Sequence, residues 1–167
     1  MMNMRSLLLV ALWFCMPLLS SGMSENDSLN LDNVSRYIFK DTADNECTFA
    51  AFKGKYIFLD IWSMSCGPCL KEMAYLETIV DKYKDKPIHF ISICVENNTM
   101  LWKKFLKKKG MKGVHWITPL FSPFLKDNGF IAVPHFVLID KKGNVMWRNA
   151  KHPSDANLQK ELDLLFE

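Results

Sequence analysis

The sequence predicts an α/β domain in which a central mixed β-sheet is flanked by helices, with a strand extension on its N-terminal side. Two runs, 56–62 and 88–95, are almost continuously apolar and β-prone, as in strands that are covered on both faces. Amphipathic helical patterns follow both runs, and a hairpin pattern comes later. This order is typical of one mixed-sheet domain, which we place at 34–167.

The first 22 residues have the features of a secretory signal peptide. Arg5 precedes an apolar run over 7–19, and small residues follow it. The run is shorter than the about 20 apolar residues of a spanning helix, and Pro17 interrupts it. We therefore expect cleavage after Gly22 and export to the periplasm or cell envelope, with membrane attachment only if the segment is retained. Residues 23–33 are expected to be a polar linker.

The charge balance does not call for a nucleic acid partner, since the net charge is only +3. The densest basic run, 103–109, is interleaved with apolar residues at the spacing of one buried helix face. We interpret this run as the solvated side of a helix, with an anionic partner surface as the alternative.

The first half of the domain contains two strands and a helix. A first strand is predicted at 34–40, and turn residues at 41–45 separate it from the segment around Cys47. The run 56–62 is predicted to be the central strand. Residues 68–83 carry apolar side chains at spacings of three and four, which predicts a helix of about four turns.

The second half of the domain continues the alternation of strands and helices. A buried strand is predicted at 88–95, and a lysine-rich helix at 99–109 ends near Gly110. Strands at 135–139 and 145–148 are predicted to pair antiparallel around a glycine-containing turn. A closing helix is expected to begin at Pro153-Ser154, with Ser154 as its cap.

Four of the five cysteines lie in the domain, and two of them form the motif Cys66-Gly67-Pro68-Cys69. A disulfide that closes so short a loop constrains the unfolded chain little, which argues against a structural staple. A zinc half-site is the other alternative, but the four histidines do not supply a spaced second pair. Soft thiolates could also hold copper(I) with a third ligand, as in a metal carrier.

The position of Cys66 favours redox chemistry. It follows a buried strand and opens a helix, so its sulfur should lie among unpaired amides at the positive end of the helix dipole. Such positions lower a cysteine pKa from about 8.5 to between about 3.5 and 7.5. We predict that Cys66 is the attacking thiol and that Cys69, one turn on, resolves the mixed disulfide.

Residues 60–69, Asp-Ile-Trp-Ser-Met-Ser-Cys-Gly-Pro-Cys, resemble the active-site strand and turn of the thioredoxin superfamily. Glu72 and the later run 133–143 narrow the resemblance to TlpA/ResA-like thiol–disulfide oxidoreductases. The resemblance implies a thioredoxin-like fold and disulfide exchange with envelope proteins, with reduction favoured. It also implies protein disulfide or dithiol substrates, a separate redox partner that recharges the protein, and no bound cofactor. We expect a monomer.

The resemblance also assigns roles to single residues. Asp60 would be a buried proton acceptor for the resolving thiol, unless it only satisfies a backbone or lysine partner. Glu72 would tune thiol ionisation, the alternative being a surface carboxylate near the helix start. Val133 would offer its backbone to a substrate strand, and its bond to Pro134 would be cis. We expect Trp62 near the active site and in contact with substrate.

The sequence leaves several features open. Ser65 stands where relatives usually have an aromatic residue, so the redox partner and potential are not specified. Ser63 partly imitates a peroxidase motif, although Leu59 replaces its proline and the adjacent cysteine pair suits disulfide exchange better. Cys94 is expected to be a free buried cysteine, with a Cys47–Cys94 bridge as the alternative.

Overall fold

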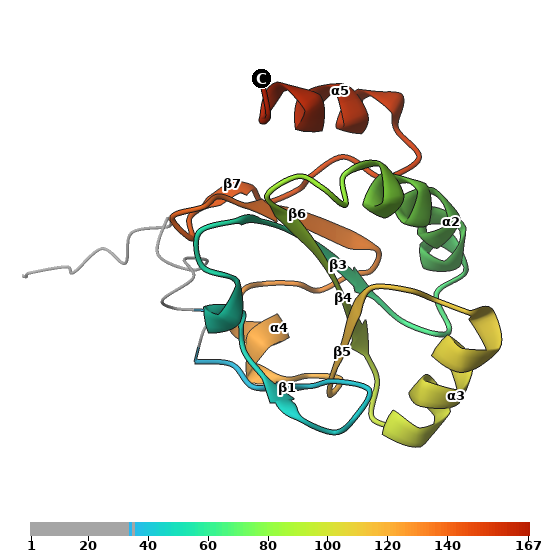
Figure 1. The fold of residues 1–167 in the computed structure, drawn as a ribbon. Coiled ribbons are helices and arrows are strands. Elements are labelled where there is room, and N and C mark those ends of the chain that lie inside the picture. The colour runs from blue at the N-terminus through green and yellow to red at the C-terminus, as the bar shows by residue number, and fades with distance from the viewer. Residues whose placement is uncertain (1–33, 35) are drawn as a thin grey trace, which may run out of the picture.

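A computed structural model describes residues 34 and 36–167 of the chain (Figure 1). The predicted signal peptide, its cleavage after Gly22 and the linker at 23–33 lie outside the described residues. Among the helices of the described part, none is long and apolar enough to cross a membrane.

The core of the fold is a seven-stranded mixed sheet in the order β2-β1-β5-β4-β3-β6-β7. The strands are β1 (Phe39–Lys40), β2 (Glu46–Cys47), β3 (Tyr56–Trp62), β4 (Ile88–Val95), β5 (Val114–Thr118), β6 (His135–Ile139) and β7 (Val145–Trp147). Strands β3, β4 and β5 are parallel, and the remaining pairs are antiparallel.

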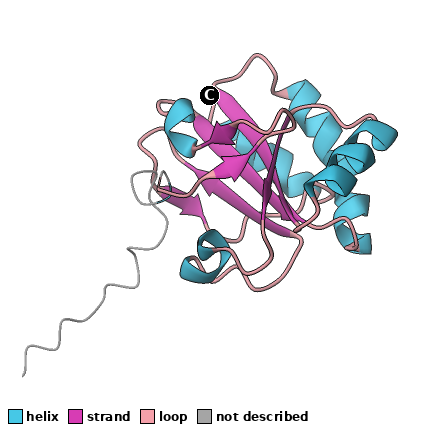
Figure 2. Ribbon diagram, turned by 90° about the horizontal axis from the view of Figure 1, so that it is seen from below, coloured by secondary structure: helices cyan, strands magenta, loops and turns pink. Residues whose placement is uncertain are grey.

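Helices cover both faces of this sheet (Figures 1 and 2). The helical elements are the 3₁₀ helix η1 (Phe49–Phe52) and the α-helices α2 (Gly67–Lys82), α3 (Thr99–Lys109), α4 (Pro123–Asp127) and α5 (Ala156–Leu164). The predicted architecture, a central mixed sheet flanked by helices, is confirmed.

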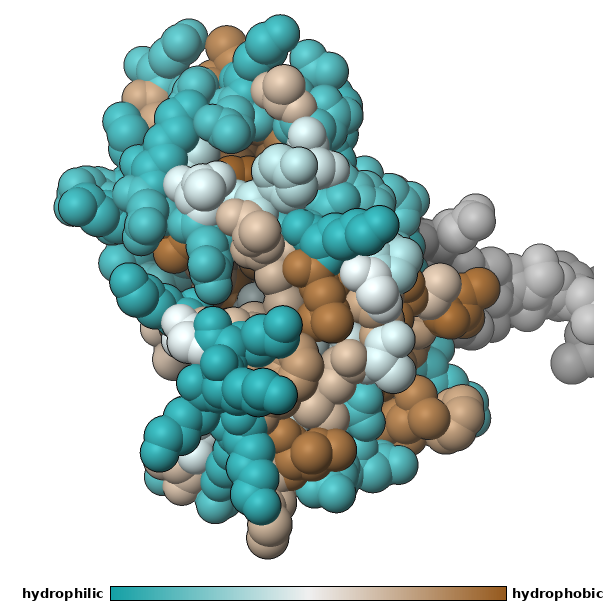
Figure 3. Space-filling model, turned by 90° about the vertical axis from the view of Figure 1, so that its right-hand side faces the viewer, coloured by the Kyte–Doolittle hydropathy of each residue, from teal (hydrophilic) through white to brown (hydrophobic). Residues whose placement is uncertain are grey.

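Successive side chains of β3 point to opposite faces of the sheet, so they pack against different helices. Leu59 and its odd-numbered neighbours pack into a core with η1 and α4, whereas Phe58 packs with α2 and α5. Asp60 and Trp62 share the parity of Phe58, and Trp62 packs between α2 and α3. On the face that carries α2 and α3, apolar residues form a band between hydrophilic surfaces (Figure 3).

The long, strongly patterned elements agree with the sequence predictions. Strands β3 and β4 have the predicted bounds, and α2 is displaced by one residue. Helix α3 ends where Gly110 adopts φ 65°, a left-handed conformation that closes the last turn. The hairpin of β6 and β7 is present, and Gly143 in its turn has φ 92°.

The first predicted strand, 34–40, is wrong over most of its length, since only Phe39–Lys40 form β1. The amide of Tyr37 donates to the carbonyl of Val34, so a turn precedes the strand. The Tyr37 ring packs edge-on against Phe124 of α4, with 5.5 Å between ring centroids. Side-chain packing against α4 therefore takes the place of a longer strand.

The start of the last helix also differs from the prediction. Helix α5 begins at Ala156, and its cap is Asp155, whose Oδ1 accepts a hydrogen bond from the amide of Asn157 at 2.8 Å. Ser154, the predicted cap, hydrogen-bonds to Glu72 of α2 instead. Because Ser154 is bonded to Glu72 of α2, Asp155 takes its place as the cap of α5. Strand β5 and helix α4 were not predicted.

Candidate active site

Cys66 and Cys69 form a disulfide at the junction between β3 and α2, with their Cα atoms 5.2 Å apart. Cys66 is the N-cap of α2, and its Sγ accepts a hydrogen bond from the amide of Cys69 at 3.1 Å. This sulfur therefore lies among the first amides of the helix, as predicted.

The two cysteines differ in their access to solvent. Cys66 is half-buried, whereas only 2% of Cys69 is exposed. A large reactant can reach Cys66, and the fold shields Cys69. This asymmetry suits an attacking thiol and a resolving thiol that meets only a partner already bound to Cys66.

The loop that enters β6 lies against the disulfide. The Val133–Pro134 peptide bond is cis, as the resemblance implied. The carbonyl oxygen of Val133 lies 3.7 Å from Cys66 Sγ, and both Val133 and Pro134 are half-buried. A backbone segment with an accessible edge thus lies directly across from the reactive sulfur.

Asp60 lies on the α2 side of the sheet and is 3% exposed. Its Oδ2 accepts a hydrogen bond from Ser92 Oγ at 3.1 Å, and Ser92 is its neighbour in β4. Burial raises the pKa of Asp60 to about 7; the Ser92 hydrogen bond opposes this shift, and the charge of Glu72 adds to it. The hydrogen-bond partner of Asp60 is thus a hydroxyl rather than the backbone or lysine of the alternative.

Glu72, three residues after Cys69, is tied to the segment before α5. Its two carboxylate oxygens accept hydrogen bonds from the amide of Ser154 at 2.9 Å and from Ser154 Oγ at 2.8 Å. His152 Nδ1 lies 3.4 Å from Oε1, and the Glu72 side chain is 15% exposed. Sequence reasoning missed both partners, because they are about 80 residues away and Ser154 has the signature of a helix cap.

Trp62 corrects one of the predicted site roles. Its side chain is fully buried, because the alternation of β3 turns it toward α2 and α3 rather than toward solvent. Its ring centroid lies 5.8 Å from that of Phe105, and it shares a hydrophobic cluster with Cys69. Trp62 therefore lies near the active site, as predicted, but its side chain has no exposed surface for a substrate to contact.

Cys94 and Cys47 are both free thiols. Cys94 lies opposite Trp62 in the neighbouring parallel strand and is fully buried, which raises the pKa of its thiol. Cys47 is half-buried in β2 at the far edge of the sheet. The free buried state of Cys94 is confirmed, and the alternative of a Cys47–Cys94 bridge is wrong.

The turn that leads into the motif is polar. Ser63 Oγ donates to Glu96 Oε1 at 3.0 Å and lies 3.0 Å from Ser65 Oγ. Ser65 is exposed, so no large side chain covers the disulfide at this position. Glu96 was not predicted. Over residues 34 and 36–167, no three His, Cys, Asp or Glu side chains are placed to hold a metal ion.

Comparisons with known proteins point to the same chemistry. The Redoxin family pattern matches residues 30–162. The thiol-disulfide oxidoreductase ResA of Bacillus thuringiensis subsp. konkukian is 32% identical over 110 residues, which are 66% of this chain and 63% of that protein. ResA of Bacillus anthracis is 29% identical over the same shares. The chain thus spans less than two thirds of the length of these curated relatives.

Solved structures support the fold. The solution structure of a candidate thiol-disulfide oxidoreductase from Bacteroides vulgatus has a TM-score of 0.72 and 29% identity, covering 78% of this chain and 86% of that one. A thiol-disulfide oxidoreductase from Bacteroides fragilis, at 20% identity, has a TM-score of 0.68, covering 75% of this chain and 96% of that one.

Proposed function

This chain belongs to the Redoxin family, as a TlpA/ResA-like member of the thioredoxin superfamily, and we propose that it exchanges disulfides with other proteins through Cys66 and Cys69. The observation that carries the proposal is the unequal access of the pair: Cys66 is half-buried at a helix N-terminus, whereas Cys69 is almost fully buried behind it. The names of the ResA relatives support the same reaction type.

In the reducing direction, both cysteines begin as thiols. The Cys66 thiolate, stabilised by the first amides of α2, attacks one sulfur of a client disulfide. The client S–S bond breaks, the leaving sulfur takes up a proton, and a mixed disulfide joins Cys66 to the client. Cys69 then loses its proton and attacks Cys66 Sγ, which releases the second client thiol. The client disulfide is reduced as Cys66–Cys69 is oxidised.

Asp60 is proposed as the base that accepts the proton of Cys69. A carboxyl whose pKa is about 7 is well suited to take up and release a proton near neutral pH. Glu72 would tune this step, since its charge raises the pKa of Asp60. The backbone at Val133 and Pro134 would pair with an extended client segment while the sulfurs react.

We propose that the protein is exported and works in the cell envelope, where it reduces client proteins and is recharged by a separate dithiol partner. No bound cofactor enters these steps, because the electron pair passes between sulfur atoms. The reverse reaction would oxidise a client dithiol, so the partner that recharges the protein determines the direction.

A trapping experiment tests the proposal. The Cys69→Ala variant keeps the attacking thiol but cannot resolve, so it should accumulate mixed disulfides with client proteins, visible after non-reducing separation. Cys66→Ala, the matched control, should trap none. Identified clients would reveal both substrate and direction. Absence of mixed disulfides, together with no reduction of protein disulfides by the wild type, would contradict the proposal.

A further inference from the structure

An apolar pocket of about 510 Å³ lies between α4, the loop before β6 and the end of β4. We call it the α4 pocket, and its apolar lining includes Val95, Phe121, Leu125, Phe130, Ile131 and Val133. We propose that the α4 pocket is a specificity subsite that receives an aromatic side chain of the client polypeptide while the client disulfide reacts at Cys66. This inference rests on the proposed function and deepens it.

The pocket is continuous with the reactive sulfur. Val133 lines the pocket, and its carbonyl oxygen lies 3.7 Å from Cys66 Sγ. Ser63, three residues before Cys66, belongs to the same wall. An extended chain advances about 3.3 Å per residue, so a client joined to Cys66 and paired along Val133 brings a residue a few positions from its own cysteine to the pocket.

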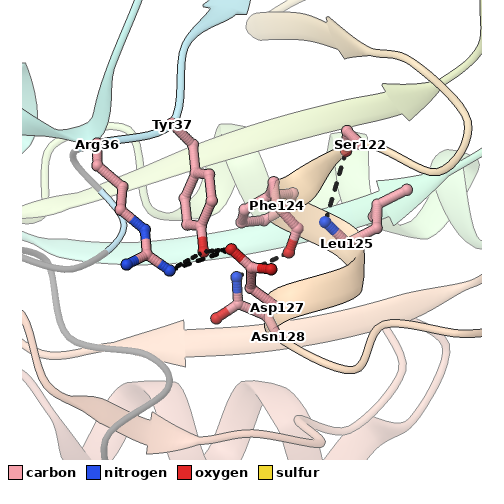
Figure 4. Close-up of polar contacts among 7 residues, drawn as sticks. All are labelled: Arg36, Tyr37, Ser122, Phe124, Leu125, Asp127 and Asn128. Atoms are coloured by element: carbon pink, nitrogen blue, oxygen red, sulfur yellow. Dashed lines mark hydrogen bonds and ion pairs between the residues drawn. The ribbon is translucent and has the colours of Figure 1, made fainter.

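The wall formed by α4 is fixed by several polar contacts (Figure 4). Ser122 caps the helix by accepting from the amide of Leu125 at 3.5 Å. Tyr37 Oη donates to Asp127 Oδ2 at 2.8 Å, and Arg36 forms an ion pair with the same oxygen at 3.1 Å. A wall held from outside is already in place before a ligand arrives, which reduces the ordering cost of binding.

Phe130, another part of the lining, is also held in place. Its ring centroid lies 4.7 Å from that of His135, and the Arg148 guanidinium lies 5.6 Å from the ring. Arg148 donates to the carbonyl of Asn128, the residue that follows α4. The lining is therefore an aromatic and aliphatic surface suited to a flat apolar side chain.

The rim carries large apolar side chains that the domain leaves uncovered. Phe121 is 85% exposed and Ile131 is 96% exposed, and a partner that covered them would remove this apolar surface from water. Phe121 has φ 67°, a conformation uncommon for a residue other than glycine. Lys126 is the cation of the lining, which contains no acidic residue. A client with an aromatic residue next to an acidic one would match both features.

The test uses disulfide-linked peptides reduced by the full mature protein. A parent peptide carries alanines around its cysteine, and in the series one Phe moves from three residues before the cysteine to three after it. We expect one position of Phe to raise kcat/KM about tenfold over the parent. This gain in kcat/KM should be lost in Ile131→Ser. An acidic residue next to that Phe should raise kcat/KM further for the wild type but not for Lys126→Glu.

The controls separate the possible outcomes. Tyr75→Ser removes an exposed aromatic residue of α2 that is not part of the pocket lining, and it should keep the full gain. A small aliphatic disulfide reagent carries no side chain for the pocket, so its reduction reports on Cys66 and Cys69 alone and shows whether Ile131→Ser is folded. This variant should reduce the reagent as fast as the wild type does. Equal kcat/KM for every peptide, with the reagent still reduced, would overturn the subsite and leave the proposed function intact.

Two further results would count against the proposal in different ways. If neither the peptides nor the reagent is reduced, the proposed function fails and the subsite fails with it. If sedimentation shows a dimer that Ile131→Ser disperses, a second copy of the chain occupies the pocket and the client subsite is overturned.

Discussion

At the residue scale, Asp60 is a carboxylic acid buried within the central sheet. A strand position opposite Ser92 leaves its carboxyl 3% exposed with one hydroxyl partner. Desolvation is the leading cause of its raised pKa, because an ionised carboxylate without water or a cation is costly. The same environment that makes Asp60 costly to ionise makes it suitable as a base near neutral pH.

Asp60→Asn should slow the resolution step by roughly a hundredfold, as expected for the loss of a positioned base. The attack by Cys66 should be nearly unchanged. Rapid acid quenching of the mixed disulfide between the protein and a peptide measures the two steps separately. An unchanged rate of resolution would show that Asp60 is only a buried polar residue.

Glu72→Gln should lower the pKa of Asp60, because it removes the negative charge that helps to raise it. The pH at which resolution reaches half of its maximal rate should fall accordingly. Glu77→Gln is the matched control, since Glu77 is an exposed carboxylate on the same helix. Equal pH profiles for wild type and Glu72→Gln would assign Glu72 a purely structural role in holding Ser154.

At the element scale, the ends of the helices combine local and long-range effects. The start of α2 is local: a strand ends, Cys66 caps the helix and Pro68 occupies its first turn. The start of α5 depends on a distant residue, because Glu72 accepts a hydrogen bond from the hydroxyl of Ser154 and Asp155 becomes the cap. Helix α4 is only five residues long and is stabilised by Tyr37 and Arg36 from a distant part of the chain.

Gly110→Ala should destabilise the protein by about 1 kcal/mol, because Gly110 has φ 65° at the end of α3. No atom lies within 4 Å of the Cβ that alanine would add, so the cost is one of backbone conformation. Lys108→Ala, an exposed position in the last turn of the same helix, requires no positive φ and should be nearly neutral. Urea unfolding of the oxidised proteins gives both values, and equal stabilities would contradict this account.

At the scale of the whole molecule, the sheet brings the site together from four parts of the chain. The carboxyl end of β3 carries the cysteine pair, and antiparallel β6 brings Val133 and Pro134 to the same edge. The neighbouring parallel strand β4 supplies Ser92, and the segment before α5 supplies Ser154. A redox centre at this edge is thus supported by a rigid, buried sheet.

The buried carboxyl should make the stability of the oxidised protein depend on pH. The folded pKa of Asp60, about 7, lies above the ordinary value of 3.8, so between these values the folded state holds a proton that the unfolded state has lost. Stability should therefore fall as the pH rises from about 4 to about 7, by up to roughly 4 kcal/mol from this group.

Urea unfolding at pH 5 and pH 8 checks this sign. Asp60→Asn should remove most of the loss of stability between pH 5 and pH 8, because the amide needs no proton to remain neutral. At pH 8 this variant should be more stable than the wild type. Ser92→Ala, a nearby control, keeps the carboxyl and should keep the loss. A wild type that is as stable at pH 8 as at pH 5 would contradict the assignment.

The sequence by itself determined the redox pair, the strands β3 and β4, the helices α2 and α3, and the final hairpin. Each depends on local pattern: alternation, helical spacing, a proline in a first turn or a glycine with positive φ. It also indicated a buried Asp60, since a lone carboxylate in a continuous apolar strand has no exposed face to occupy. The cis bond before Pro134 was available only through family resemblance.

Only the tertiary structure decided the features that depend on side chains from distant segments. The short β1, the capping of α5 by Asp155, the hydrogen bonds from Ser154 to Glu72 and the burial of Trp62 all follow from packing between elements. Strand β5 and helix α4 are too short for their pattern to stand out, and tertiary contacts stabilise them. The α4 pocket has the same origin, because it exists only once α4 and the loop before β6 lie beside Cys66.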